Sequence, residues 1–162
     1  MIESEPLVAP WGAIDAVKTF LRIDGDGEDA RLQPIVAAAI EASEAWTGTP
    51  LLARLFSETL DVTGGWQRLG RQPVRAIAGV ETPAGVALPV GDYQIDIDAE
   101  GRGLVRMLGS VPRVRVRYEA GLTHDWSALS PSLRASVVRV AALGSEADGA
   151  EVPPPPRVLR LV

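Results

Sequence analysis

Two kinds of hydrophobic periodicity occupy different parts of this chain, and their separation limits the possible folds more than any single motif. Apolar residues recur at helical spacing over about 10–23, 28–47 and 130–144. Between them, about 55–121 is rich in glycine, proline and short β-type runs. Segregated helices and strands are typical of an α+β fold. We therefore expect a small helical bundle, made of two N-terminal helices and one C-terminal helix, with an antiparallel β-rich insertion and an extended C-terminal tail.

An acidic stretch, "LRIDGDGEDARL" (21–32), separates the first two predicted helices. Acidic residues alternate from Asp24 to Glu28, as they do in a calcium loop. An EF-hand loop also needs a glycine at its sixth position and a glutamate at its twelfth, and these positions hold Asp29 and Ile35. The stretch is better explained as a helix entrance, where carboxylates accept bonds from free N–H groups and complement the helix dipole.

The second predicted helix has an apolar stripe at three-four spacing. The stripe consists of Leu32, Ile35, Val36, Ala39, Ile40, Ser43 and Trp46. Glu41 and Glu44 lie largely away from it, and Gly48 supplies the stop. Pro34 lies inside this segment, so the helix either begins near Pro34 or bends there. Because the connection to the first helix is short, we expect the two helices to pack antiparallel.

The β-rich insertion contains five candidate strands. They cover 56–62, 73–82, 93–98, 104–108 and 113–119. The last, "RVRVRYE", is the clearest, because its apolar residues alternate with charged ones, which predicts one buried and one solvated face.

Arg113, Arg115 and Arg117 share the solvated face of this strand, about 7 Å apart. Like charges in a row repel one another and favour an acidic neighbour. Two interpretations stay open. The row is either a solvated face balanced by acids on an adjacent strand, or a subunit interface or surface facing DNA phosphates.

The bulk composition indicates a soluble globular protein. Of 162 residues, 46% are hydrophobic and 23% charged, and no apolar run approaches the length that crosses a bilayer. The N-terminus lacks the pattern of a secretory signal, and the absence of cysteine excludes disulfides and thiolate metal sites. A net charge of −5 disfavours sequence-specific binding of nucleic acid.

Candidate catalytic groups are few. His124 is the only histidine, it has no G-x-S-x-G partner motif, and beside Asp125 it is more simply a loop residue. Asp96 and Asp98 share one side of their strand, where a pocket could separate their pKa values, but they approach an exposed turn, so solvation is the expected state. We expect no catalytic residue, no metal site and no cofactor.

The end of the chain is a second candidate for interaction. Residues 1–152 would form a single domain, whereas 153–162 join a stiff proline run to an apolar end. Such an end is either disordered or docked on another surface, and its apolar character favours docking. The proposed docking residues are Pro153, Pro154, Pro155, Pro156, Arg157, Val158, Leu159, Arg160, Leu161 and Val162.

The order of these features resembles a known family. The segment 13–51 resembles the opening of head-tail connector proteins, or adaptors, of long-tailed bacteriophages and gene transfer agents. The matching features there are Leu21-Arg22-Ile23, Glu28-Asp29, Ala37 to Ala39, Glu44, Trp46 and Thr47-Gly48. Further along, the matching features are the Pro73-Val74 strand, Asp92-Tyr93, Tyr118 with Ala120 and Gly121, and the helix in "LSPSLRASVVRVAAL". Pro34, the proline-rich tail and a last helix without aromatic residues depart from the family pattern.

The resemblance implies a structural role without catalysis or cofactor. Adaptors form a ring, usually dodecameric, on the portal protein at the capsid vertex, and they carry the next tail component, a stopper or tail terminator. DNA passes through the lumen without sequence-specific binding, and no membrane is involved. In that setting 153–162 would insert into the portal, and the chain would reside at the head-tail interface of the particle.

Two alternatives stay open beside this one. The first is a small non-catalytic β module that binds a ligand of the carbohydrate type through Trp66 and neighbouring acids. The second is an enzyme that uses Asp96 and Asp98.

Overall fold

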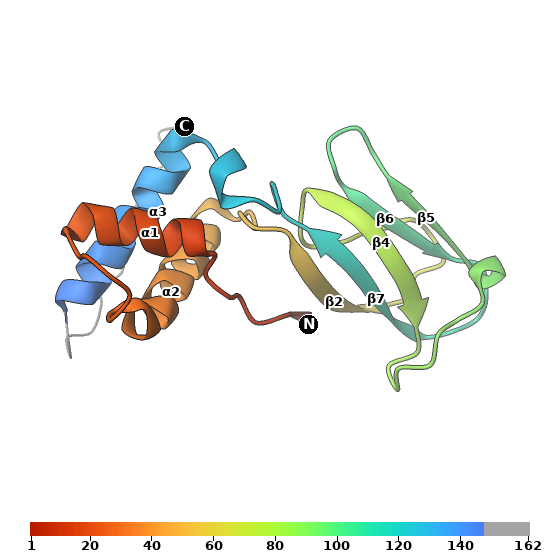
Figure 1. Cartoon of the computed structure of the whole chain (residues 1–162). Coiled ribbons are helices and arrows are strands. Elements are labelled where there is room, and N and C mark those ends of the chain that lie inside the picture. The colour runs from red at the N-terminus through yellow and green to blue at the C-terminus, as the bar shows by residue number, and fades with distance from the viewer. Residues whose placement is uncertain (148–162) are drawn as a thin grey trace.

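Three helices form one of two lobes in the computed structural model, which describes residues 1–147 (Figure 1). They are α1 (Trp11–Leu21), α2 (Asp29–Thr47) and α3 (Pro131–Glu146). All three pack on one another around a core of buried apolar side chains that includes Ile14, Leu32 and Val137. The three predicted helices are confirmed. Within residues 1–147, no helix is both long and apolar enough to span a membrane.

The ends of the helices follow the predicted signals in two of three cases. Ser130 caps α3 by accepting a hydrogen bond from the Leu133 N–H, and Pro131 follows as the first helical residue. Gly48 ends α2 in the left-handed conformation, with φ of 72°. The expectation that α3 ends at Gly144 is wrong, because the helix continues to Glu146.

The start of α2 decides one open alternative and corrects one expectation. The helix begins at Asp29 and includes Pro34, which excludes the alternative of a start near the proline. Glu28, at the N-cap, makes no side-chain capping bond. The neighbouring Asp29 instead accepts a 2.7 Å hydrogen bond from Lys18 Nζ, which ties α2 to α1. The acidic segment at the start of α2 therefore also links α2 to α1.

The middle of the chain forms the second lobe, a sandwich of two antiparallel sheets. The four-stranded sheet has the order β1 (Ile2–Ser4), β2 (Arg54–Asp61), β7 (Arg113–Ala120), β4 (Val74–Glu81). The three-stranded sheet has the order β3 (Gln67–Arg68), β6 (Gly103–Met107), β5 (Tyr93–Ile97). Short 3-10 helices lie at Val90–Asp92 and Trp126–Ala128. The five predicted strands are confirmed, and β1 and β3 are additional.

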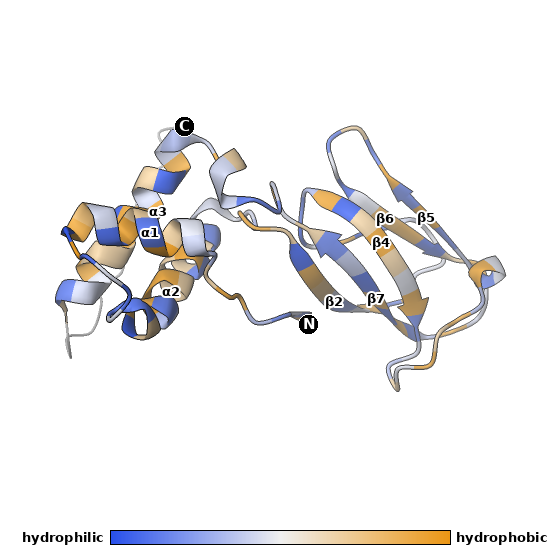
Figure 2. Ribbon diagram, in the orientation of Figure 1, coloured by the Kyte–Doolittle hydropathy of each residue, from blue (hydrophilic) through white to orange (hydrophobic). Residues whose placement is uncertain are grey.

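The sandwich has its own core, separate from that of the helices. Val114, Val116 and Tyr118 of β7 are buried together with Val105 and Met107 of β6. Hydrophobic residues occur in both lobes, in patches along the helices and strands that alternate with hydrophilic ones (Figure 2). The predicted alternation along β7 is confirmed, and the class is α+β, as expected.

Three connections of the chain join the two lobes. An N-terminal arm leads from β1 at the edge of the sandwich to α1 (Figure 1). The other two run side by side, since the Leu122 N–H donates to the Pro50 carbonyl at 3.0 Å and the Ala53 N–H donates to the Thr123 carbonyl at 2.8 Å. The predicted tail, 153–162, lies outside the described residues.

Candidate functional site

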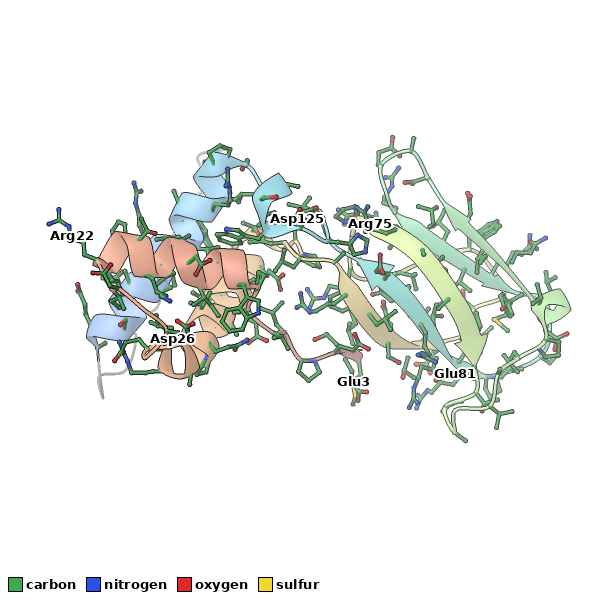
Figure 3. The ribbon with its side chains drawn as sticks, viewed as in Figure 1. Glu3, Arg22, Asp26, Arg75, Glu81 and Asp125 are labelled. Atoms are coloured by element: carbon green, nitrogen blue, oxygen red, sulfur yellow. The ribbon has the colours of Figure 1, made fainter. Side chains whose placement is uncertain are left out.

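The arginine row lies on β7, the second inner strand of the four-stranded sheet, with its side chains on the face opposite the sandwich core. Arg113 Nε donates a 2.7 Å hydrogen bond to Asp61 on β2. Arg115 Nη1 lies 3.6 Å from a carboxylate oxygen of Glu81 on β4. Figure 3 labels Glu81 at the end of β4 remote from the helices. Acids on both neighbouring strands thus balance these two arginines, as one of the two interpretations requires.

Arg117 differs from the other two members of the row. It is exposed, and its partners in register are Ser57 on β2 and Gly79 on β4, neither of which carries a charge. Within residues 1–147, Arg117 takes part in no ion pair. It also lines a shallow hollow with Glu3 and Glu5 of the N-terminal arm. Arg117 is therefore the member of the row that has no ionic partner among residues 1–147.

The two candidate carboxylates do not form a pair of catalytic type. Asp96 lies on β5, whereas Asp98 lies beyond the strand, in the turn, where it accepts hydrogen bonds from the backbone and the guanidinium of Arg102 at 2.8 and 2.6 Å. Burial by itself raises the pKa of Asp98, but the bonds from Arg102 outweigh it and hold the pKa below its usual value. Asp98 is thus an ionised residue that shapes a turn.

The histidine also has a local role. His124 Nε2 lies 2.8 Å from Glu119 of β7, and Arg75 of β4 approaches the same carboxylate oxygen at 3.7 Å. Asp125, next to the histidine, accepts a hydrogen bond from the Ser127 N–H and so caps the second 3-10 helix. Figure 3 labels Arg75 and Asp125 near the junction of the lobes, Asp125 toward the helices and Arg75 on the sandwich. His124 is a loop residue, as expected.

Metal-binding side chains do not gather in the part of the chain that the structure describes. There, no group of three or more histidine, cysteine, aspartate or glutamate residues is placed to hold an ion. Asp26, a member of the acidic stretch, lies at the loop between α1 and α2 (Figure 3).

The sequence reasoning missed a buried ion pair at the junction of the lobes. Glu44 is only 8% exposed, although its position on α2 was assigned to the solvated side. It accepts hydrogen bonds from both terminal nitrogens of Arg54, at 2.9 and 2.7 Å, and from the Leu51 N–H at 2.8 Å. Trp46, assigned to the buried stripe, is 57% exposed. Both errors occur in the last turn of α2, where the chain that enters the sandwich covers the Glu44 side of the helix.

Known solved structures give the context for these surfaces. A chain in the neck of an empty gene transfer agent (GTA) particle, computed with C6 symmetry, has a TM-score of 0.73 and 27% identity, and the match covers 94% of this chain and 87% of that one. A chain in the neck of a native GTA particle, computed with C12 symmetry, has a TM-score of 0.68 and 30% identity, with 95% and 88% covered. A chain in the virion of a native GTA particle has a TM-score of 0.68, 27% identity, and 95% and 89% covered.

No family model and no curated protein matches the sequence. The similar structures are components of particles and give no support to a carbohydrate-binding module. Their similarity extends over both lobes, which agrees with the order of motifs along the sequence. The chain therefore belongs to the head-tail connector (adaptor) family of bacteriophages and gene transfer agents, and it is a structural component of the neck of such a particle.

Proposed function

We propose that this adaptor forms a closed ring, of twelve copies, on the portal protein and joins the capsid vertex to the next tail component, a stopper or tail terminator. One observation carries the proposal. Over 95% of its length, this chain is similar, with 30% identity and a TM-score of 0.68, to a chain in a neck computed with C12 symmetry. Of the arginine row, Arg117 alone takes part in no ion pair within the part of the chain that the structure describes, which suits a contact with a like copy. The proposed function includes no catalysis.

The charge of the chain suits a conduit for DNA. A net charge of −5 per copy opposes retention of the phosphate backbone, whereas a strongly basic lumen would hold it. Because Asp61 and Glu81 balance Arg113 and Arg115, the arginine row adds little net positive charge. We accordingly assign Arg117 to a contact between subunits and not to DNA.

The proline-rich tail is the proposed anchor to the portal. Residues 153–162 combine a stiff spacer with four apolar side chains and lie outside the described residues. Each copy would contribute a weak contact, and the ring would multiply it, because linked sites bind with a high effective concentration.

Electron microscopy of the protein with its portal tests the proposal. We expect a closed ring on one end of the portal assembly. Scattered or absent decoration of portals, in a preparation where the protein is folded, contradicts the proposed function.

A second experiment tests the anchor alone. The four tail side chains Val158, Leu159, Leu161 and Val162 are replaced by serine, which preserves the length, the prolines and both arginines. We expect portal attachment to fall at least about tenfold, since the loss repeats in every copy. The matched control replaces Arg157 and Arg160 by glutamine and should keep most of the attachment. Undiminished attachment of the serine variant would rule out the tail as the anchor.

A further inference from the structure

An apolar groove runs along the helical lobe between α1 and α3. Two adjoining hollows of about 340 and 300 Å³ lie there, and both are lined by Phe20 of α1 and Arg139 of α3. Phe20 is 57% exposed, and Leu143 of α3 is 64% exposed. We name this surface the α1–α3 groove, and its principal lining residues are Ala16, Phe20, Arg134, Val138, Arg139 and Leu143. No residue of α2 lines either hollow.

A second surface lies on the side of α2 that faces away from α1 and α3. Its exposed residues are Ala38, Glu41, Ala42, Ala45 and Trp46, which we name the α2 face. Their spacing of three and four places them along one side of the helix. Two of them, Glu41 and Ala45, also line an open hollow at the junction of the lobes, together with Arg71. The buried residues of α2, such as Val36 and Ile40, lie on the other side and pack on the remaining helices.

These two surfaces point in opposite directions. In the lobe each helix contacts the other two, so α2 covers one side of the α1–α3 pair. The groove is on the side of that pair that α2 leaves open, and the α2 face points away from the pair altogether. A surface and its complement on opposite sides of one molecule produce a head-to-tail contact. Such contacts form a closed ring when a whole number of copies completes one turn without a shift along the axis, and an open filament otherwise.

The surfaces are complementary in shape and polarity. Three alanines on the α2 face let another helix pair approach closely, and Trp46 projects as a single large apolar side chain. The groove offers apolar walls and exposes Phe20 and Leu143. An exposed apolar groove of this kind is a common acceptor for a helix.

Their charges are complementary as well. Arg134 and Arg139 line the groove, with the single acid Glu146 at the end formed by the second hollow, and Glu41 lies in the α2 face. Within residues 1–147, none of the three takes part in an ion pair. Arg134 Nε is buried and has no hydrogen-bond partner in that part of the chain. A carboxylate that enters the groove would therefore meet unpaired guanidinium groups.

We propose that the α2 face of one copy docks in the α1–α3 groove of the next copy, with Glu41 placed against Arg139 and Arg134. This contact supplies the ring with a helical interface, and it rests on the proposed ring. The occupant of the groove is thus a second copy of this chain, and the interface is heterologous.

Cysteine cross-linking on portal-bound protein tests the contact directly, because the natural chain has no cysteine. The variant carries Ala42→Cys in the α2 face and Ala135→Cys in the groove, and it is treated with a short bismaleimide. We expect a ladder of covalent oligomers that rises well beyond the dimer. A control pair, Ala42→Cys with Asp24→Cys in the α1–α2 loop, should give no ladder. If Ala42→Cys alone gives abundant dimers, like faces meet and the inference is overturned.

Charge reversal provides an independent measurement. Glu41→Arg alone and Arg139→Glu alone should each lower the number of closed rings at least about tenfold, because like charges meet at every interface. The combined variant should restore rings. Circular dichroism verifies that each variant is folded.

The outcomes separate this inference from the proposed function. If the unaltered protein forms no ring on the portal, the proposed function fails. If the unaltered protein forms rings, but the cysteine pair gives no ladder and the charge reversals leave the rings intact, the ring stands and the interface assigned here is wrong.

Discussion

A buried polar pair between β2 and β7 shows how single residues fix this sandwich. Glu58 is 7% exposed, and its carboxylate accepts a 2.9 Å hydrogen bond from the Tyr118 hydroxyl and a 2.8 Å bond from the Gly70 N–H. The Tyr118 hydroxyl in turn accepts a bond from the Arg71 N–H at 3.3 Å. Burial, and then the negative charge of Glu58, raise the pKa of Tyr118. The pair thus holds the chain before β4 against the four-stranded sheet.

This pair predicts how stability depends on pH. Below about pH 10, the ordinary value for tyrosine, folded and unfolded chains both keep the proton. Above it, the unfolded chain ionises while folded Tyr118 remains neutral, so this group lowers the free energy of unfolding by up to about 1.4 kcal/mol per pH unit. In urea unfolding between pH 9 and 11, Tyr118→Phe should therefore lose stability less steeply than the natural protein.

A matched variant makes that measurement specific. Tyr93→Phe removes the other tyrosine of the chain and keeps the Glu58 pair, so it should retain the steep fall. At neutral pH, Tyr118→Phe should still unfold more easily, by about 1–3 kcal/mol, because Glu58 loses a donor while it stays buried. An equal slope for Tyr118→Phe and the natural protein would contradict the assignment.

The Glu44 pair shows what residue patterns cannot reveal. Helical periodicity describes which residues share a face of α2, but it does not tell which later segment will cover that face. Arg54, the partner of Glu44, belongs to β2, and the two meet only because the chain turns back at Pro50 and Leu51. Burial of a charged residue follows from this tertiary contact, so the periodicity assigned Glu44 to the wrong side.

Elements that depend on local signals were predictable. Each of the three helices has an apolar stripe, α3 has a serine cap at Ser130, and α2 has a glycine stop at Gly48. Each of these signals lies within a few residues of the helix that it marks, and β7 alternates clearly. β1 and β3 have only three and two residues, which is too short for a period to emerge. The pairing of the strands into two sheets was not predictable, since it arises from contacts between distant segments. Of the candidate site, the sequence identified the arginine row, but the balancing acids Asp61 and Glu81 required the sheet register.

At the scale of elements, Gly121 allows the two chain segments that connect the lobes to lie close together. Its φ of 147° is rarely adopted by other residues, and a Cβ at this position would lie 2.5 Å from the backbone of Ala53. We expect Gly121→Ala to lower the free energy of unfolding by about 3 kcal/mol or more, because two backbone segments must separate. Urea unfolding measures the loss.

Gly48 is the matched control for that substitution. It also has a positive φ, of 72°, but a Cβ there would meet nothing within 4 Å. Gly48→Ala should therefore cost only the backbone strain, about 1–2 kcal/mol. Equal losses for the two variants would show that strain alone, and not the close approach to Ala53, determines the role of Gly121.

On the scale of the whole molecule, two separate cores give each lobe its own source of stability. Among residues 1–147, the helical core and the sandwich core share no buried residue, and three connections of the chain join them. The proposed ring on the portal would require contacts with different neighbours on different sides of the molecule. Independent cores let each lobe keep its own surfaces, the α1–α3 groove on one and the arginine row on the other, without a change in the other lobe.

Native-state hydrogen exchange can measure this independence. Ile40 is fully buried in the helical core, and Ile40→Ala should lower the protection of α1, α2 and α3 by about 2–5 kcal/mol while β2, β4 and β7 keep theirs. Phe56→Ala, in the sandwich core, should reverse the pattern, with a loss of about 3–5 kcal/mol in the strands. If either substitution lowers protection equally in both lobes, the chain opens as one cooperative unit. In that case a contact made by one lobe in the ring would stabilise the other as well, because the binding free energy would then be shared across the junction at Gly121.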